Sequence, residues 1–360
     1  MSHILLVSAT LNAGGAERQL TGMANYWVGS GHRVTLTTWS GPEVADFYPL
    51  DPRVERVRFA IPLARGSLQV PWILARRVRS LRRLLHLQRP DAVVSFIAAT
   101  NIHTLLASTG LRLTVAVSDR AHPAVDATVT RPWRVLRRLL YRFADRVVAQ
   151  TTQAREWTRR YCDTDSLVIP NALRPLVRVD APRETLVLAI GRLDPQKGFD
   201  ILLRAFALLA GRFREWNVAI LGEGPEREGL LALRASLGLE SRVVLVGEVR
   251  DVESWLARAG LVVQPSRYEG FPNAVLEAMG FGAAVVSTDC LAGPSDLIRD
   301  GVNGRLVRVD DTTGLAQVMA ELMGKPELRA RLGEQAAAVR ETYRLESVMM
   351  RWNEALGLAK

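Results

Sequence analysis

Short apolar runs alternate with amphipathic segments along almost the whole chain. In the first half, apolar runs at 3–9, 32–38, 91–97, 113–119 and 146–151 have the length and β-branched content of buried strands. Between them the sequence predicts a helix ending near residue 28, another beginning near 101, and a basic helix near 132–144. This order of strand, helix and strand predicts a parallel sheet with helical crossovers.

A second series of the same kind fills the rest of the chain, with apolar runs at 185–191, 216–222, 242–247, 261–266 and 283–288. The segment 166–184 contains three prolines and is the predicted linker. We therefore expect an α/β protein with two doubly wound, Rossmann-like parallel sheets: domains at 1–168 and 169–340, and a last helix at 341–360 that packs back on the first domain. Ligands bind beyond the carboxyl ends of such strands, so two facing domains predict one cleft.

Charge is unevenly divided between the two halves. The 360-residue chain has a net charge of +10, but residues 1–180 contain 25 Arg, no Lys and 13 acidic residues, a balance of +12, whereas residues 181–360 carry −2. A phosphorylated partner, nucleic acid or an anionic membrane surface could each explain a basic first half.

Several classes of protein are disfavoured. The two cysteines, Cys162 and Cys290, make no disulfide framework, which favours a reducing, cytoplasmic compartment. The chain starts with a strand pattern rather than a signal peptide, and no run approaches about 20 apolar residues. The stretch LGEGPEREG (221–229) imitates a dinucleotide-binding motif, but Arg227 stands at its third glycine position, which counts against an NAD enzyme.

The stretch RYEGFPNAVLEAMGFGAAVVST (267–288) carries two glutamates, Glu269 and Glu277, between two predicted strands. Asn273 is the predicted N-cap of a helix that stops at Gly280 and Gly282. Glu269 then lies in the loop after a strand, and Glu277 lies about one turn into the helix, so both can reach one ligand. The N–H groups at the helix start favour an anion such as phosphate.

Two further loops follow predicted strands. AIGRLDPQKGFDIL (189–202) contains Arg192 and Lys197, which could neutralise a diphosphate without a metal. NAGGAER (12–18) contains Gly14 and Gly15, which permit close backbone approach or positive φ. Either pair could instead be ordinary solvated loop or turn residues. No His/Cys cluster has metal-ligand spacing.

The segment 71–88 predicts an amphipathic helix in which an apolar stripe lies opposite Arg76, Arg79 and Arg83. We expect this basic face to bind an anionic acceptor on or near a membrane, with a solvated face as the simpler alternative. Arg134, Arg137 and Arg138 form a second predicted basic group.

Four stretches resemble glycosyltransferase family 4, a family of retaining enzymes with the GT-B fold: GRLDPQKGFDILL, LGEGPE, VVLVGEVRDV and the long segment that begins at PSRYEGFPNAVLEAMG. The stretches ATLNAGGAERQL, VSFIAATNIHTLLA and VSDRAHP further resemble its bacterial branch that extends polyprenyl-diphosphate-linked oligosaccharides, including N-acetylgalactosamine transferases. The resemblance implies a metal-independent hexosyltransferase without a cofactor, with an acceptor-binding first domain and a nucleotide-sugar-binding second domain. The partners that it implies are a UDP-linked sugar as donor, a glycan on a polyprenyl diphosphate as acceptor, and the inner face of the cytoplasmic membrane.

The resemblance also implies roles for individual residues. Glu269 corresponds to the glutamate near the hydroxyls of the donor sugar, and Glu277 to the one on the ribose of the nucleotide. Arg192 and Lys197 correspond to the diphosphate-binding cations, whose charge would stabilise the leaving group. The family's cleft histidine has two possible counterparts, Arg120 and His122. Gly270, Phe271 and Pro272 correspond to the backbone that lines the sugar. Asn273, Ala274 and Val275 correspond to the helix start that faces the diphosphate, and Val249 corresponds to the position that pairs with the base.

Two other functional hypotheses stay open at this point. A nucleic-acid-binding protein would suit the basic first half, but no motif for single-stranded RNA or for helix-turn-helix recognition is present. A GT-B enzyme without a sugar acceptor, such as an epimerase or a phosphorylase, would use the same donor residues.

Overall fold

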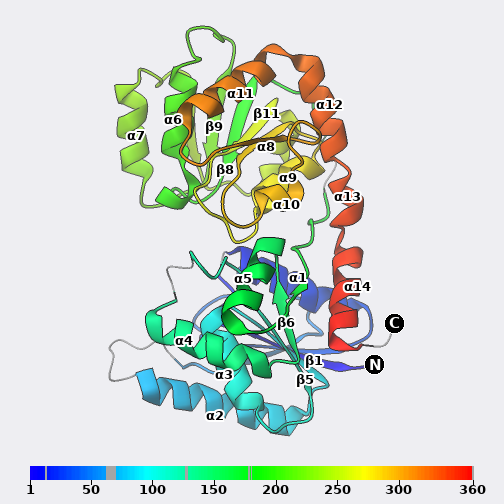
Figure 1. Ribbon diagram of the computed structural model, residues 1–360. Helices are drawn as coiled ribbons and strands as arrows, with labels where there is room; N and C mark the ends of the chain where they lie inside the picture. The colour runs from blue at the N-terminus through cyan, green and yellow to red at the C-terminus, as the bar shows by residue number, and fades with distance from the viewer. Residues whose placement is uncertain (13, 62–69, 126–128, 177–178, 180, 359–360) are drawn as a thin grey trace. The chain divides into compact units, whose positions relative to one another are not determined.

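The computed structural model describes residues 1–12, 14–61, 70–125, 129–176, 179 and 181–358. The chain forms two compact units, one of residues 1–171 together with 346–360 and one of residues 172–345 (Figure 1). The predicted divisions, at 168/169 and 340/341, fall a few residues earlier. Ala13 of the glycine loop and residues 177, 178 and 180 of the predicted linker lie outside the described residues.

The first unit is built on a seven-stranded sheet in the order β3-β2-β1-β4-β5-β6-β7, in which every neighbouring pair is parallel. Its strands are β1 (His3–Ser8), β2 (Arg33–Thr38), β3 (Glu55–Arg58), β4 (Ala92–Phe96), β5 (Thr114–Ser118), β6 (Arg146–Ala149) and β7 (Leu167–Val168). Its helices are α1 (Gly15–Gly29), α2 (Val70–Gln88), α3 (Ala98–Ser108), α4 (Arg131–Leu140), the 3₁₀ helix η2 (Tyr141–Phe143), α5 (Thr152–Cys162) and α14 (Leu345–Leu356).

The last helix, α14, belongs to the first unit although the chain reaches it after the second. Trp352 of α14 is buried, with its ring centroid 6.2 Å from that of Phe96, the last residue of β4. Asn353 accepts a 2.8 Å hydrogen bond through Oδ1 from Trp27 Nε1 of α1. The chain therefore completes the core of its first unit with its final residues.

The second unit repeats the doubly wound pattern with six parallel strands in the order β10-β9-β8-β11-β12-β13. These are β8 (Leu186–Ile190), β9 (Asn217–Leu221), β10 (Val243–Gly247), β11 (Leu261–Gln264), β12 (Val285–Thr288) and β13 (Arg305–Val307). The helices are α6 (Phe199–Ala207), α7 (Arg227–Ser236), α8 (Val252–Arg258), α9 (Asn273–Gly280), α10 (Pro294–Leu297), α11 (Thr312–Gly324), α12 (Pro326–Ala336) and α13 (Val339–Thr342), and the 3₁₀ helix η3 spans Pro195–Lys197. The expectation of two doubly wound parallel sheets is confirmed.

Strand order determines where each unit can bind a ligand. In the second sheet the order reverses between β8 and β11, so the loops that leave these two strands diverge to opposite faces of the sheet. Such a switch point opens a crevice at the carboxyl ends of the strands. The loop after β8 carries Arg192 and Lys197, and the loop after β11 carries Glu269. The residues singled out in the sequence thus lie where the topology places a site.

Candidate active site

The two switch-point loops of the second unit are joined by hydrogen bonds. The Arg267 N–H donates to the Gln196 carbonyl over 2.7 Å, and Gln196 Nε2 donates to the Tyr268 carbonyl over 2.9 Å. Gly198 has φ +64°, and a Cβ there would lie 2.1 Å from the Pro265 carbonyl oxygen. Only glycine satisfies both conditions, which lets the end of η3 rest on the loop after β11.

Lys197 and Glu269 form a largely buried ion pair at this junction. Lys197 Nζ lies 2.7 Å from Glu269 Oε1, and their side chains are 18% and 5% exposed. Ser266 Oγ donates to the same Oε1 over 2.7 Å. Among the described residues both of these bonds end on Oε1, so Oε2 is available to accept from a ligand. An ammonium group has three donors, so Lys197 also retains capacity for an anion.

Arg192 has a different environment. Its side chain is 71% exposed, and its guanidinium binds Asp194, with Nε 2.6 Å from Oδ2. The carboxylate of Asp194 is largely buried, so it anchors Arg192 to the loop after β8 while the guanidinium faces solvent. The structure brings Arg192 and Lys197 into one loop, as predicted, but only Lys197 pairs with a predicted site residue.

Glu277 is held by an arginine that the sequence did not single out. Arg174 Nη2 lies 3.3 Å from Glu277 Oε2, and Arg174 Nη1 lies 2.9 Å from Glu253 Oε1. Glu253 is in the first turn of α8, and Glu277 is in α9. One arginine thus joins two carboxylates from two helices. No local sequence pattern links position 174 to position 277, because Arg174 lies within the predicted linker at 166–184.

Helix α9 begins one residue earlier than predicted. Pro272 is its N-cap and Asn273 its first residue, so the expected N-cap role of Asn273 is wrong. Gly293, at φ +124°, packs against Pro272, where a Cβ would lie 2.4 Å from the proline ring. The first N–H groups of a helix have no partner within it, and here these include Ala274 and Val275. The predicted stop is confirmed, since α9 ends at Gly280.

The remaining predicted donor-site positions lie around these groups. Phe271 is buried in the loop after β11, and its ring centroid is 6.5 Å from that of Tyr343. Gly270 precedes it and is partly exposed. Val249, in the loop after β10, packs against the core that includes Phe271.

In the first unit, the glycine loop leads directly into α1. Gly14 is the N-cap of this helix and has an extended φ of −165°, and neither Gly14 nor Gly15 has positive φ. Of the two expected alternatives, close backbone approach and positive φ, the second does not apply to these glycines. A Cβ on Gly14 would meet the carboxylate of Glu17, which lies in the first turn of α1.

Arg120, after β5, has a guanidinium that is partly buried. It lies 4.1 Å above the Phe96 ring, and Nη2 donates to Asn171 Oδ1. Burial lowers the pKa of Arg120 to about 9, partly offset by the negative charge of Glu17, so the group stays cationic at neutral pH. Among the described residues its Nε has no hydrogen-bond partner.

His122 occupies a structural position. It is buried, and its Nδ1 accepts a 3.2 Å hydrogen bond from the Ala124 N–H. Burial lowers the pKa of His122; a hydrogen bond with the Gln153 backbone raises it in part, and the charge of Arg137 lowers it by a smaller amount. The histidine is thus held neutral and bonded to backbone, whereas Arg120 keeps an N–H available.

The arginines of the two predicted basic groups differ in exposure. On α2, Arg76, Arg79 and Arg83 are exposed, while Leu81 and Leu85 are buried. On α4, Arg134 and Arg138 are exposed, but Arg137 is fully buried. Its Nη2 donates to the Pro123 carbonyl over 3.1 Å, and its Nη1 lies 3.5 Å from Asp119 Oδ2. Arg137 therefore binds its own unit and contributes nothing to a surface site.

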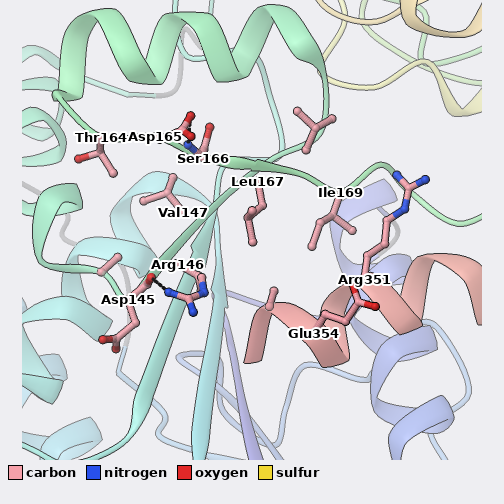
Figure 2. Close-up of a pocket in the computed structure, with 13 residues that line it drawn as sticks. Asp145, Arg146, Val147, Thr164, Asp165, Ser166, Leu167, Ile169, Arg351 and Glu354 are labelled. Carbon is pink, nitrogen blue, oxygen red and sulfur yellow. Dashed lines mark hydrogen bonds between the residues drawn. The ribbon is translucent and has the colours of Figure 1, made fainter. Parts of the chain in front are cut away.

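A cavity of about 690 Å³ lies elsewhere in the first unit, between the start of β6, the strand β7 and helix α14 (Figure 2). Arg351 and Glu354 of α14 border it, with Leu167 and Ile169 opposite. Asp145 and Arg146 place it at the amino end of β6, whereas sites in parallel sheets lie at carboxyl ends. It is separate from the groups described above.

Two features that the described residues lack are a metal-binding cluster and a membrane-spanning helix. Within the described part of the chain, no group of three or more His, Cys, Asp or Glu side chains could hold a metal ion. None of the helices described here combines the length and apolar character needed to cross a bilayer.

Comparison with known proteins gives the family. Residues 14–172 match the model described as "Glycosyl transferase 4-like domain", and residues 184–325 match the one described as "Glycosyl transferases group 1". A Campylobacter jejuni protein named "GalNAc-alpha-(1->4)-GalNAc-alpha-(1->3)-diNAcBac-PP-undecaprenol alpha-1,4-N-acetyl-D-galactosaminyltransferase" is 28% identical over 369 residues, which cover 100% of this chain and 99% of that protein.

Solved structures give the fold. Sucrose-phosphate synthase from Thermosynechococcus elongatus has a TM-score of 0.86 at 18% identity and covers 98% of both chains. Anabaena Alr3699/HepE, in complex with UDP and glucose, has a TM-score of 0.79 at 20% identity, over 99% of this chain and 100% of that one. Both family models and these neighbours agree with the two doubly wound sheets. The chain therefore belongs to the group 1 glycosyl transferases, with a glycosyl transferase 4-like domain as its first half, and it is a glycosyltransferase of the GT-B fold.

Proposed function

We propose that this glycosyltransferase moves a hexose or N-acetylhexosamine from a UDP-linked donor to a glycan carried on a lipid diphosphate, with retention of the α configuration. The observation that carries the proposal is the Lys197–Glu269 pair at the switch point of the second unit. It supplies an ammonium group for a diphosphate and, within hydrogen-bond reach, a carboxylate for sugar hydroxyls. The UDP bound by the Anabaena neighbour supports the choice of donor.

The proposed chemistry needs only charge and hydrogen bonds from the chain. When the bond between sugar and phosphate breaks, negative charge grows on the diphosphate. Lys197, the guanidinium of Arg192 and the N–H groups at the start of α9 are fixed before the reaction, so they stabilise this charge more in the transition state than in the ground state. Glu277, held by Arg174, is suited to accept from the ribose hydroxyls. We propose that no metal is required.

The first unit would hold the acceptor. The name of the Campylobacter relative specifies an undecaprenol-linked substrate, and that relative spans the whole of this chain. The exposed arginines of α2 are suited to the phosphates of such an acceptor and to an anionic membrane surface. Cell-surface glycan assembly at the cytoplasmic face of the membrane is the setting that fits these partners.

The test is transfer from UDP-sugars to a lipid-diphosphate acceptor, with the product examined by NMR. We expect UDP release to depend on the acceptor and the anomeric coupling constant to show an α-linkage. Release of UDP without an acceptor would instead favour an epimerase or a phosphorylase, and a β-linked product would overturn the retaining assignment. A thermal-shift panel of nucleotide diphosphates identifies the base, because a ligand at about 100 times its Kd stabilises the folded protein by about 2.7 kcal/mol.

A further inference from the structure

Helix α4 and the 3₁₀ helix η2 expose a row of apolar side chains. Val135, Leu139 and Phe143 are 49%, 47% and 68% exposed. Their spacing of four residues aligns Val135 and Leu139 on one side of α4 and continues that side into η2. Single exposed apolar residues are ordinary, but an aligned row on one helix marks an interaction surface. We call these three residues the α4 stripe.

The residues beside the α4 stripe are basic. Arg131, Arg134, Arg138 and Arg142 are all exposed, and none forms an ion pair with another residue that the structure describes. The sequence contains no Asp or Glu from 127 to 144. Four guanidinium groups that have no carboxylate partner in the described part of the chain lie next to an apolar row, and they give this surface an affinity for anions that a simple protein contact would not need.

The opposite side of α4 already has its partners. Arg137 is buried against Asp119 and lies 4.7 Å from the ring of Trp157, while Trp133 lies 5.5 Å from His103 of α3. The helix is thus attached to its unit by one face, and the α4 stripe remains on the other. The neighbouring Tyr161 of α5, itself exposed, carries Arg138 over its ring at 5.3 Å and so extends the mixed apolar and basic surface.

We propose that the α4 stripe inserts into the interfacial region of an anionic membrane, with the four arginines on its lipid headgroups. A helix with apolar side chains beside arginines has the composition of an interfacial membrane helix. A nucleic acid would use the arginines but would have no use for exposed valine, leucine and phenylalanine side chains. The inference rests on the proposed lipid-linked acceptor. It adds that attachment of the protein to the membrane depends on insertion of the α4 stripe. Electrostatic attraction between the arginines of α2 and anionic lipids is then only part of the binding.

An environment-sensitive label tests insertion directly. Both native cysteines, Cys162 and Cys290, are buried, so a Leu139→Cys variant can be labelled with the fluorophore NBD at the new thiol. We expect a blue shift and stronger emission when phosphatidylglycerol-containing vesicles are added, and little change with phosphatidylcholine alone. The matched control is Leu208→Cys, which replaces a well-exposed leucine of the second unit. Its label should not respond.

A second variant measures the contribution of the α4 stripe to attachment. Val135→Ser/Leu139→Ser/Phe143→Ser should lower partition onto phosphatidylglycerol vesicles by about tenfold or more at high salt, where the arginines are screened. Transfer to a short soluble acceptor should be unchanged, while transfer to a lipid-linked acceptor in vesicles should fall. Leu208→Ser/Val302→Ser removes exposed apolar surface from the second unit and should leave partition unaltered.

The outcomes separate this inference from the proposed function. Unchanged partition of the serine variant, or a silent label at position 139 on vesicles that do bind the protein, overturns insertion. A label that responds to RNA and not to vesicles overturns it in favour of a nucleic-acid partner. Normal insertion without transfer to any lipid-linked acceptor refutes the proposed function and leaves the membrane surface standing.

Discussion

Lys197 and Arg192 have the same predicted role but different surroundings, so their substitutions should differ. Lys197→Ala removes a cation at the proposed diphosphate position and leaves Glu269 buried without this cation. We expect a loss of about 2 to 4 kcal/mol in transition-state stabilisation, together with lower thermal stability. Arg192→Ala removes an exposed guanidinium, so turnover should fall with little change in the melting temperature. Steady-state kinetics and thermal melts distinguish the two effects.

Lys197→Arg is the control for charge, and it should restore stability better than turnover, because a planar guanidinium does not fit the position of a point charge. EDTA should leave the wild-type rate unchanged. Full activity in both alanine variants, or loss of wild-type activity in EDTA, would contradict the proposed metal-independent stabilisation of the leaving group.

Arg174 is expected to act through Glu277 as a positioning residue. Replacing it by Gln removes the charge that holds Glu253 and Glu277 together and leaves two carboxylates near each other without a cation. We expect a KM for the donor raised about tenfold with a smaller change in kcat, since ribose contacts bind substrate and transition state alike. Glu253→Gln keeps the Arg174–Glu277 contact and should have a weaker effect. If Arg174→Gln and Glu253→Gln lowered kcat equally and left the KM for the donor unchanged, Arg174 would have a different role.

The sequence indicated the kinds of residue in the candidate site, but it could not indicate their partners. Glu269 and Lys197 were identified because each follows a buried strand, and strand ends converge in a parallel sheet. Arg174 lies far from Glu277 along the chain and within a proline-rich segment, so nothing local revealed it. Arg137 was misassigned because its place in a basic run does not show that it turns inward to Asp119.

At the scale of elements, we expect the contact between η3 and the loop after β11 to determine the geometry of the proposed donor site. Gly198→Ala places a Cβ against the Pro265 carbonyl and also strains a φ of +64°. Gly238 has the same φ, but a Cβ there meets nothing within 4 Å. Gly238→Ala should therefore cost only about 1 to 2 kcal/mol in unfolding free energy. Gly198→Ala should cost more and also weaken nucleotide binding, measured by denaturation and by titration calorimetry. Identical behaviour of the two variants would mean that the loop contact is unimportant.

Elements with a strong apolar pattern were predicted with the right type and order. The strands that were missed, β3, β7 and β13, lie at sheet edges and are short. In β3 the sequence is Glu55-Arg56-Val57-Arg58, whose charged residues bind Asp46 and Arg33 at the edge of the sheet. Edge strands need little apolar content, so a pattern of buried strands does not reveal them.

At the scale of the whole molecule, the chain leaves its first unit at residue 171 and returns to it with α14. This route follows from burial, because α14 carries Trp352 and Met349 on its covered face and Met350 on its exposed face. The sequence pattern predicted a last helix that packs on the first domain. The hydrogen bond between Asn353 of α14 and Trp27 fixes this helix against α1.

The final prediction concerns this return. Trp352→Ala should destabilise the protein by about 3 to 5 kcal/mol, because it leaves a large cavity against Phe96 in the core of the first unit. Met350→Ala, two positions away on the exposed face of the same helix, should change stability by no more than about 0.5 kcal/mol. Since the proposed donor residues belong to the second unit, both variants should keep the thermal shift produced by nucleotide while Trp352→Ala starts from a lower melting temperature. If the two substitutions lower the melting temperature equally, or if Trp352→Ala alone abolishes nucleotide binding, α14 does not serve the first unit as its packing indicates.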